Sequence, residues 1–130
     1  MEYVKSFRDL EVYKLSRKVS KEIFGLSKSF PREELYSLTD QVRRSSRSVG
    51  AQIAEAWGKR RYELHFISKL TDADSEQLET QHWIDVANEC DYIDNPKKEL
   101  LIDECEQIGK MLYSMIGKSG MFCNTKTSKN

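Results

Sequence analysis

Apolar residues recur along most of the chain at steps of three, four or five positions, the spacing of one face of an α-helix. The pattern predicts four amphipathic helices, in chain order over residues 7–30, 33–58, 62–90 and 96–117. No alternation typical of a β-strand extends beyond a few residues. Long helices with short connections predict an all-α fold, an antiparallel up-down-up-down four-helix bundle.

Cap signals mark both ends of the fourth predicted helix. Asp94 or Asn95 can cap its first turn, and Gly117 is a natural stop at its end. The segment after Gly117 is polar and carries few apolar residues, so it is expected to be disordered. The predicted organisation is one four-helix bundle domain over residues 1–117 and a disordered C-terminal tail over residues 118–130.

The second predicted helix combines an apolar stripe with basic side chains. Its apolar positions are Leu35, Leu38, Val42, Val49, Ile53 and Ala56. Arg43, Arg44 and Arg47 form one basic cluster on it, and Lys59, Arg60 and Arg61 form a second directly after it. At about 100° of rotation per residue, Arg43 and Arg47 lie only ~40° apart, on a face other than the stripe. One face is expected to be buried, and another to meet anions or carboxylates.

Gly50 interrupts this helix close to the small polar residues Ser45, Ser46 and Ser48. A glycine in a helix interior costs about 1 kcal/mol relative to alanine. We therefore expect a kink or a close helix contact at this point.

The chain carries 21 basic and 21 acidic residues, so any attraction to nucleic acid must be local. Residues 62–94 hold only Lys69 against nine acidic residues. Two interpretations of the arginines follow. They pair with the acidic third helix, within the chain or across subunits, or they contact the phosphates of RNA or DNA. In the second case the first helix could continue the basic stripe with Lys14, Arg17, Lys18 and Lys21.

Aromatic residues on the later helices allow two interpretations. Trp57, Tyr62, Trp83 and Tyr92 fit base-stacking platforms, or anchors of a core or an interface. On the third helix, Phe66 and Trp83 add apolar area on a second side. A helix with two apolar faces often has two packing partners, so the pattern favours self-association.

No pattern of catalytic or metal-binding residues is complete. Glu79 and His82 have the E-x-x-H spacing of di-iron bundles, but the other histidine, His65, has no glutamate three residues before it. Residues 117–119 imitate the end of a P-loop without its first glycine or a preceding strand. The sequence therefore predicts a non-enzymatic protein with no cofactor and no bound metal.

The three cysteines are odd in number and contain no C-x-x-C pair, which indicates reduced thiols. Cys90 and Cys105 are expected to act as small core residues. The N-terminus lacks a secretion signal pattern, and no apolar run is long enough to span a membrane. We expect a cytoplasmic protein with no membrane partner.

Several motifs occur together along the chain. They are F-x-D-L-x-V-Y-K over residues 7–14, F-P-x-x-E-x-Y-x-L over residues 30–38, and Q-V-R-R-S-S-R-S-V over residues 41–49, followed by I-A-E. The third helix adds Ala73, Ser75, Leu78 and Glu79. With these motifs the chain, from Phe7 to about Ile116, resembles the S23 family of 23S ribosomal RNA intervening-sequence proteins. The family-motif positions include Gln41, Ser48, Ile53, Ala54 and Glu55. The family usually has proline, asparagine and glycine where this chain has Gly50, Gln52 and Ala56.

The resemblance implies a homo-oligomeric four-helix bundle, typically a ring of five subunits, with no established biochemical activity. A more distant resemblance is to the accessory variability protein of diversity-generating retroelements, which works with a reverse transcriptase and binds nucleic acid. Two functions follow as expectations. One is a homopentameric protein that binds the RNA or DNA backbone, and the other is an adaptor for a protein partner such as a polymerase, with the arginines used in assembly. Salt dependence separates them, because phosphate binding weakens steeply with salt.

Overall fold

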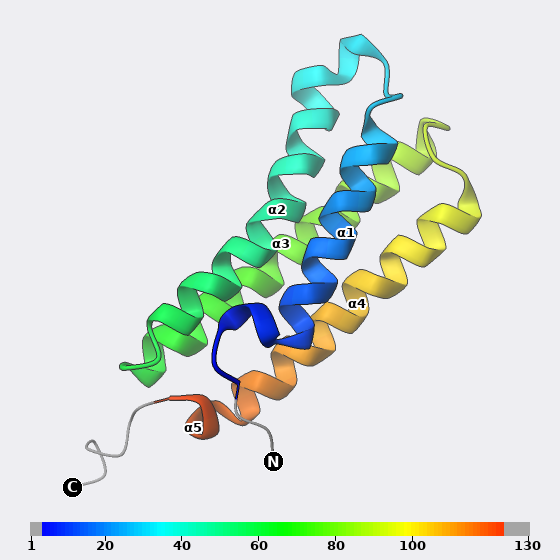
Figure 1. The fold of residues 1–130 in the computed structure, drawn as a ribbon. Coiled ribbons are helices and arrows are strands. Elements are labelled where there is room, and N and C mark those ends of the chain that lie inside the picture. The colour runs from blue at the N-terminus through cyan, green and yellow to red at the C-terminus, as the bar shows by residue number, and fades with distance from the viewer. Residues whose placement is uncertain (1–3, 124–130) are drawn as a thin grey trace, which may run out of the picture.

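The computed structural model describes residues 4–123, and every regular element within them is helical (Figure 1). Four long helices form the bundle: α1 (Glu11–Ser27), α2 (Asp40–Gly58), α3 (Glu63–Glu89) and α4 (Asn95–Gly117). Helices α1 and α3 each pack against both α2 and α4, so α1 and α3 lie diagonally across the bundle. The prediction of an all-α, antiparallel up-down-up-down four-helix bundle is confirmed.

The first helix begins later than the sequence predicted. Ser6 caps a 3-10 turn, Phe7–Asp9, by accepting a hydrogen bond from the backbone N–H of Arg8 at 3.1 Å. Leu10 is then extended and buried, and α1 starts only at Glu11. A continuous helix from residue 7 is therefore wrong, because the extended residue redirects the chain and places the Leu10 side chain in the core.

The segment before α2 also departs from the predicted α-helix. It forms a 3-10 turn, Arg32–Glu34, and then a π-helical turn, Leu35–Thr39. A π turn joins residues five apart, so the residues before it rotate away from an α-helical stripe. Leu38 remains buried, whereas Leu35 is 38% exposed and does not belong to the buried stripe that the sequence assigned.

Helices α1 and α2 approach each other closely at Gly50. A Cβ atom there would lie 3.1 Å from Ser16 Oγ and 3.5 Å from Tyr13 Cε1, so the expected close helix contact is confirmed. Nearby, the buried hydroxyls of Thr80 and Ser45 are hydrogen-bonded at 2.9 Å between α3 and α2. The middle of the bundle therefore contains a small polar layer.

The cysteines differ in their environments. Cys105 is buried in the core, as predicted, and burial raises the pKa of its thiol to about 12. Cys90 is exposed, so its assignment to the core was wrong. The physical reason is that α3 ends at Glu89 and Cys90 lies in the following turn.

A fifth, short helix, α5 (Ser119–Phe122), follows α4 (Figure 1). The Phe122 ring stacks on Phe66 of α3, with 6.0 Å between the ring centroids. The sequence placed these residues in a disordered tail over residues 118–130. The structure instead gives α5 an apolar partner in the bundle, so the ordered part extends beyond residue 117. Residues 124–130 lie outside the described residues.

Candidate nucleic-acid interface

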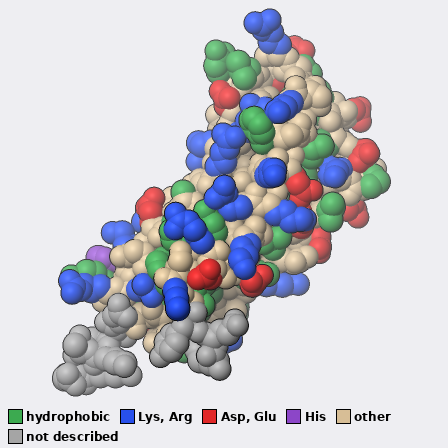
Figure 2. All heavy atoms as spheres, viewed as in Figure 1, with side chains coloured by type: hydrophobic (Ala, Val, Ile, Leu, Met, Phe, Trp, Pro, Cys, Tyr) green, Lys and Arg blue, Asp and Glu red, His purple; other side chains and the backbone are tan. Residues whose placement is uncertain are grey.

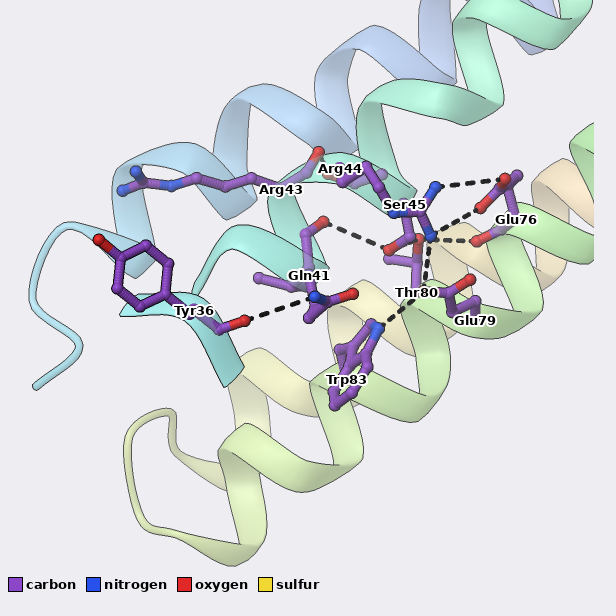
Figure 3. Close-up of polar contacts among 11 residues, drawn as sticks. Tyr36, Gln41, Arg43, Arg44, Ser45, Glu76, Glu79, Thr80 and Trp83 are labelled. Carbon is purple, nitrogen blue, oxygen red and sulfur yellow. Dashed lines mark hydrogen bonds and ion pairs between the residues drawn. The ribbon is translucent and has the colours of Figure 1, made fainter. Parts of the chain in front are cut away.

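Arg44 reaches from α2 to the acidic helix α3 (Figure 3). Its guanidinium lies 2.7 Å from a carboxylate oxygen of Glu79 and 3.4 Å from Glu76. The indole N–H of Trp83 donates to the same Glu79 oxygen at 3.0 Å. The hydrogen bond from Trp83, together with the one from Arg44, lowers the pKa of the Glu79 carboxyl. Pairing between the arginines and the acidic helix therefore occurs within the chain for Arg44.

This cluster predicts a specific acid response. Because the pKa of Glu79 is lower in the folded protein than its ordinary value of 4.5, its stabilising effect is present above that value. The effect is lost as the pH falls through the lowered pKa. We expect the free energy of unfolding of Glu79→Gln to fall less than that of the wild type between about pH 6 and pH 3. The difference between the two proteins should be less than about 1 kcal/mol, because the carboxylate side chain is 37% exposed.

Chemical denaturation at each pH, followed by tryptophan fluorescence, measures this difference. Glu89→Gln provides a control, because this exposed carboxylate makes no ion pair within residues 4–123. An acid response of Glu79→Gln equal to that of the wild type would contradict the assignment.

Arg43 and Arg47 extend from α2 toward helix α1. Their guanidinium carbons lie 4.7 Å and 5.1 Å from the centre of the Phe24 ring. Arg43 also donates from Nε to the Ser27 hydroxyl at 2.7 Å. The close-up shows Arg43 and Arg44 leaving α2 toward different neighbours (Figure 3). The three arginines therefore do not share one surface.

Arg47 borders a groove between α1 and α2 with a volume of about 850 Å³. We call it the basic groove, because five cationic residues and no acidic residue line it. Its cations are Lys14, Arg17, Lys18, Lys21 and Arg47, its floor contains Gly50, Ala51 and Ala54, and its aromatic walls are Phe7, Tyr13 and Phe24. The space-filling view shows lysine and arginine side chains gathered over the α1 face (Figure 2).

The cations of the basic groove differ in their existing partners. Lys14 pairs with the exposed Glu11 at 3.3 Å, and Lys18 pairs with Glu22 and with the buried Glu104 carboxylate of α4. Three others, Arg17, Lys21 and Arg47, make no ion pair within residues 4–123. These three are therefore the cations most available to an external anion.

The second basic cluster, which follows α2 in the turn before α3, does not line the basic groove. Lys59 lies 12 residues beyond Arg47, or about 18 Å along a helix axis. Arg60 stacks on Trp57, with its guanidinium carbon 3.6 Å from the centre of the ring, and Arg61 is exposed. Lys59, Arg60 and Arg61 therefore form a separate basic end of the bundle.

The family-motif positions have mixed environments. Ile53 is a core residue, and the Ala54 methyl lies in the floor of the basic groove. Gln41 donates to the Tyr36 carbonyl at 3.4 Å, and Glu55 pairs with Lys69 of α3 at 2.9 Å. Ser48 is partly buried. Most of this motif therefore serves the bundle itself, and Ala54 alone lines the groove.

The predicted aromatic platforms mostly contact the protein itself. Trp83 is held by Glu79, and Trp57 is covered by Arg60. Tyr92 packs on Phe30 at 5.5 Å, and its hydrogen bond to Glu34 raises the pKa of its hydroxyl to about 12. These residues are better explained as anchors within the fold. The sequence pattern did not identify the aromatic residues of the groove, Phe7, Tyr13 and Phe24. Cations at positions 14, 17, 18 and 21 recur on one face of the first helix, and this spacing could have indicated the groove.

Helix α3 has an exposed uncharged face in addition to its buried face. The residues at alternating steps of four and three are exposed and lack formal charge: Leu64, Ser68, Thr71, Ser75, Leu78 and His82. We call this set the α3 stripe. Leu64 is 79% exposed and Leu78 is 54% exposed. The spacing is typical of the contact face between two packed helices. An exposed helix face without charged residues is unusual in a chain with 32% charged residues.

The described part of the chain contains neither a metal-binding group of side chains nor a membrane-spanning helix. Residues 4–123 contain no group of three or more histidine, cysteine, aspartate or glutamate side chains placed to hold a metal ion. Over the same residues, no helix combines the length and apolarity needed to cross a bilayer.

A family model described as "23S rRNA-intervening sequence protein" matches residues 8–114 of the chain. The chain belongs to this family. A similar solved structure is a protein of unknown function from the S23 ribosomal protein family of Bacteroides thetaiotaomicron. It is 30% identical, the match covers 82% of this chain and 95% of that one, and the TM-score is 0.73. No curated protein matches the chain. The resemblance to the S23 family inferred from the motifs is thus confirmed, and it carries no assigned activity.

Proposed function

We propose that this member of the S23 family is a non-enzymatic, homo-oligomeric bundle protein that binds the phosphate backbone of nucleic acid through the basic groove. The observation that carries the proposal is the lining of the groove, with five cationic residues and no acidic one. Phosphate contacts by lysine and arginine release bound counterions and give affinity without base specificity. The balanced net charge of the chain makes this attraction local.

The proposed interface revises the set of residues chosen from sequence. It contains Arg47, with Arg43 at the edge of the groove. It also contains the four cations of α1, which we call the basic row: Lys14, Arg17, Lys18 and Lys21. Arg44 is engaged by two carboxylates of α3 and is not a primary phosphate ligand. The separate basic end formed by Lys59, Arg60 and Arg61 would supply a second, weaker contact for a long nucleic acid.

The test is binding of structured RNA and of DNA across a salt series. We expect the triple variant Arg17→Gln, Lys21→Gln, Arg47→Gln to bind about 100-fold more weakly at about 0.1 M salt. The reason is that each phosphate contact contributes about 0.7–0.9 to the slope of log K against log salt, and three contacts are removed. The salt slope itself should fall by about 2. Light scattering run in parallel reports the mass of the oligomer.

A matched control removes the same charge elsewhere. Arg32, Lys110 and Lys118 are exposed and lie outside the basic groove. The variant Arg32→Gln, Lys110→Gln, Lys118→Gln should retain the affinity and slope of the wild type within about threefold. Equal loss in both triple variants would show a diffuse charge effect and overturn the assignment to the groove.

Self-association is the second part of the proposal, and the α3 stripe supports it. We infer a ring of five subunits, the number that the family resemblance implies. A ring is a heterologous assembly, in which one face of each subunit meets a different face of the next. An uncharged seam on an otherwise acidic helix fits one side of such a contact.

A protein-binding adaptor is the alternative function, with the arginines used in assembly. The pairing of Arg44 with Glu76 and Glu79 within the chain is the kind of contact that this function would use between subunits. The adaptor function predicts no salt-sensitive binding to RNA or DNA. It also predicts that an Arg43→Glu, Arg44→Glu, Arg47→Glu variant dissociates into monomers.

A further inference from the structure

We propose that the basic groove accepts a single strand of nucleic acid in preference to a duplex, with a base entering the groove against its aromatic walls. This inference rests on the proposed function, since it names the class of nucleic acid bound at the same site. It adds a role for Tyr13 and Phe24, and it makes predictions that backbone binding alone does not make.

The groove lies where α1 and α2 come close together. Helices α1 and α2 meet at Gly50, where an added Cβ atom would lie 3.1 Å from Ser16 Oγ. Packed helices have axes about 8–10 Å apart, so the gap between their outer side chains is narrow. The floor of Gly50, Ala51 and Ala54 leaves this gap hollow. A duplex presents two phosphate backbones on a convex surface with its bases paired inside, so it would rest on the rim without placing a base in the groove.

The aromatic walls favour unpaired bases. Phe7, Tyr13 and Phe24 line the groove, and each is partly exposed. Bases in a duplex are stacked on one another and have no free face inside the helix. Bases of a single strand offer free faces, and stacking on protein aromatics is a common mode of single-strand binding. Aromatic walls inside a cationic groove therefore match a single strand better than a duplex.

Two guanidinium groups are already held at the aromatic wall. Arg43 and Arg47 lie over the Phe24 ring at 4.7 Å and 5.1 Å, and Ser27 accepts a hydrogen bond from Arg43 Nε. Arg17 donates to the Tyr13 hydroxyl at 2.7 Å. Lys28 Nζ also lies 4.8 Å from the centre of the Phe24 ring, so a base stacks on Phe24 by displacing cations from that ring. A displaced guanidinium remains close enough to hold the phosphate of the same nucleotide.

The basic row sets the number of contacts. Lys14 and Lys21 lie seven residues apart on α1, or about 10 Å along the helix axis. With Arg47 on the facing helix and Arg43 at the edge of the groove, six cations are placed to reach the strand. For single strands, six contacts at about −0.7 each bound the slope of log K against log salt at about −4.

The experiment compares four ligands of about 12 nucleotides, three of RNA and one of DNA, on the full chain. They are an unstructured single strand, the same strand paired as a duplex, an abasic strand with the same number of phosphates, and a DNA version of the single strand. We expect the RNA or DNA single strand to bind at least about 10-fold more tightly than the duplex. The abasic strand should bind roughly 5- to 150-fold more weakly than the normal strand, the range for losing one stacked base.

A variant then locates the stacking. Phe24→Leu should reduce the difference between the normal and abasic strands to less than about threefold while retaining the salt slope. Tyr113→Leu is the matched control, because Tyr113 is an exposed aromatic residue of α4 and should leave both quantities unchanged. Circular dichroism melting checks that Phe24→Leu folds, and the comparison of normal and abasic strands needs no variant at all.

The outcomes separate this inference from the proposed function. Absence of salt-sensitive binding to any ligand would overturn both. Salt-sensitive binding in which the duplex equals the single strand, or the abasic strand equals the normal one, would overturn the single-strand inference and leave backbone binding intact. Tighter binding of the base-containing strand, lost in Phe24→Leu and kept in Tyr113→Leu, would establish it.

Discussion

Replacing Leu64 and Leu78 with glutamate is expected to raise the dissociation constant between subunits by about 1000-fold, which corresponds to about 2 kcal/mol for each leucine. Both side chains belong to the α3 stripe, and both are more than half exposed in the single subunit. Each substitution places a charge in a seam that is otherwise uncharged, on a helix that is already acidic. Light scattering over a range of protein concentrations measures the shift from oligomer to monomer.

Leu100 and Tyr113 provide the matched control. Both are exposed apolar residues, and both lie on α4 outside the α3 stripe. Changing them to glutamate alters the net charge by the same amount and should leave the oligomer mass unchanged. A wild-type protein that stays monomeric at every concentration would show that self-association is wrong. An oligomer that survives the Leu64 and Leu78 changes would show that it uses another face.

The helices themselves were predictable because each buries an apolar stripe with helical spacing. The prediction failed where the backbone leaves the α conformation. At Leu10 an extended residue replaces a helical turn, and a π turn over Leu35–Thr39 moves Leu35 out of the buried face. Both changes depend on how the chain is redirected toward its neighbours in the bundle. Spacing along a single helix contains no information about that.

The candidate site was predictable only in part, for a related reason. Periodicity places Arg47 ~40° from Arg43 and ~60° from Arg44, with Arg43 and Arg44 ~100° apart, because each residue turns about 100°. It does not show which helix faces each direction. The structure supplies α3 to Arg44 and α1 to the other two. The basic groove follows from that arrangement, since its cations come mainly from α1.

The contact between α5 and the bundle predicts the second large effect, on stability. Phe66→Ala should lower the free energy of unfolding by about 3–5 kcal/mol, because Phe66 is completely buried and its removal leaves a cavity. Phe122→Ala should cost less, about 2 kcal/mol or below, because Phe122 is only partly buried. Urea unfolding followed by circular dichroism, at one protein concentration, measures both.

The double variant tests whether α5 packs on α3 as the stacked rings indicate. Since the two rings are in contact, their removal costs one shared interaction, and the double variant should lose about 0.5–1.5 kcal/mol less than the sum of the single losses. Tyr113→Ala, at an exposed position, should change stability by no more than about 0.5 kcal/mol. Strict additivity of the two phenylalanine losses would mean that the segment after residue 117 does not pack on Phe66. The bundle would then end where the sequence pattern first placed it.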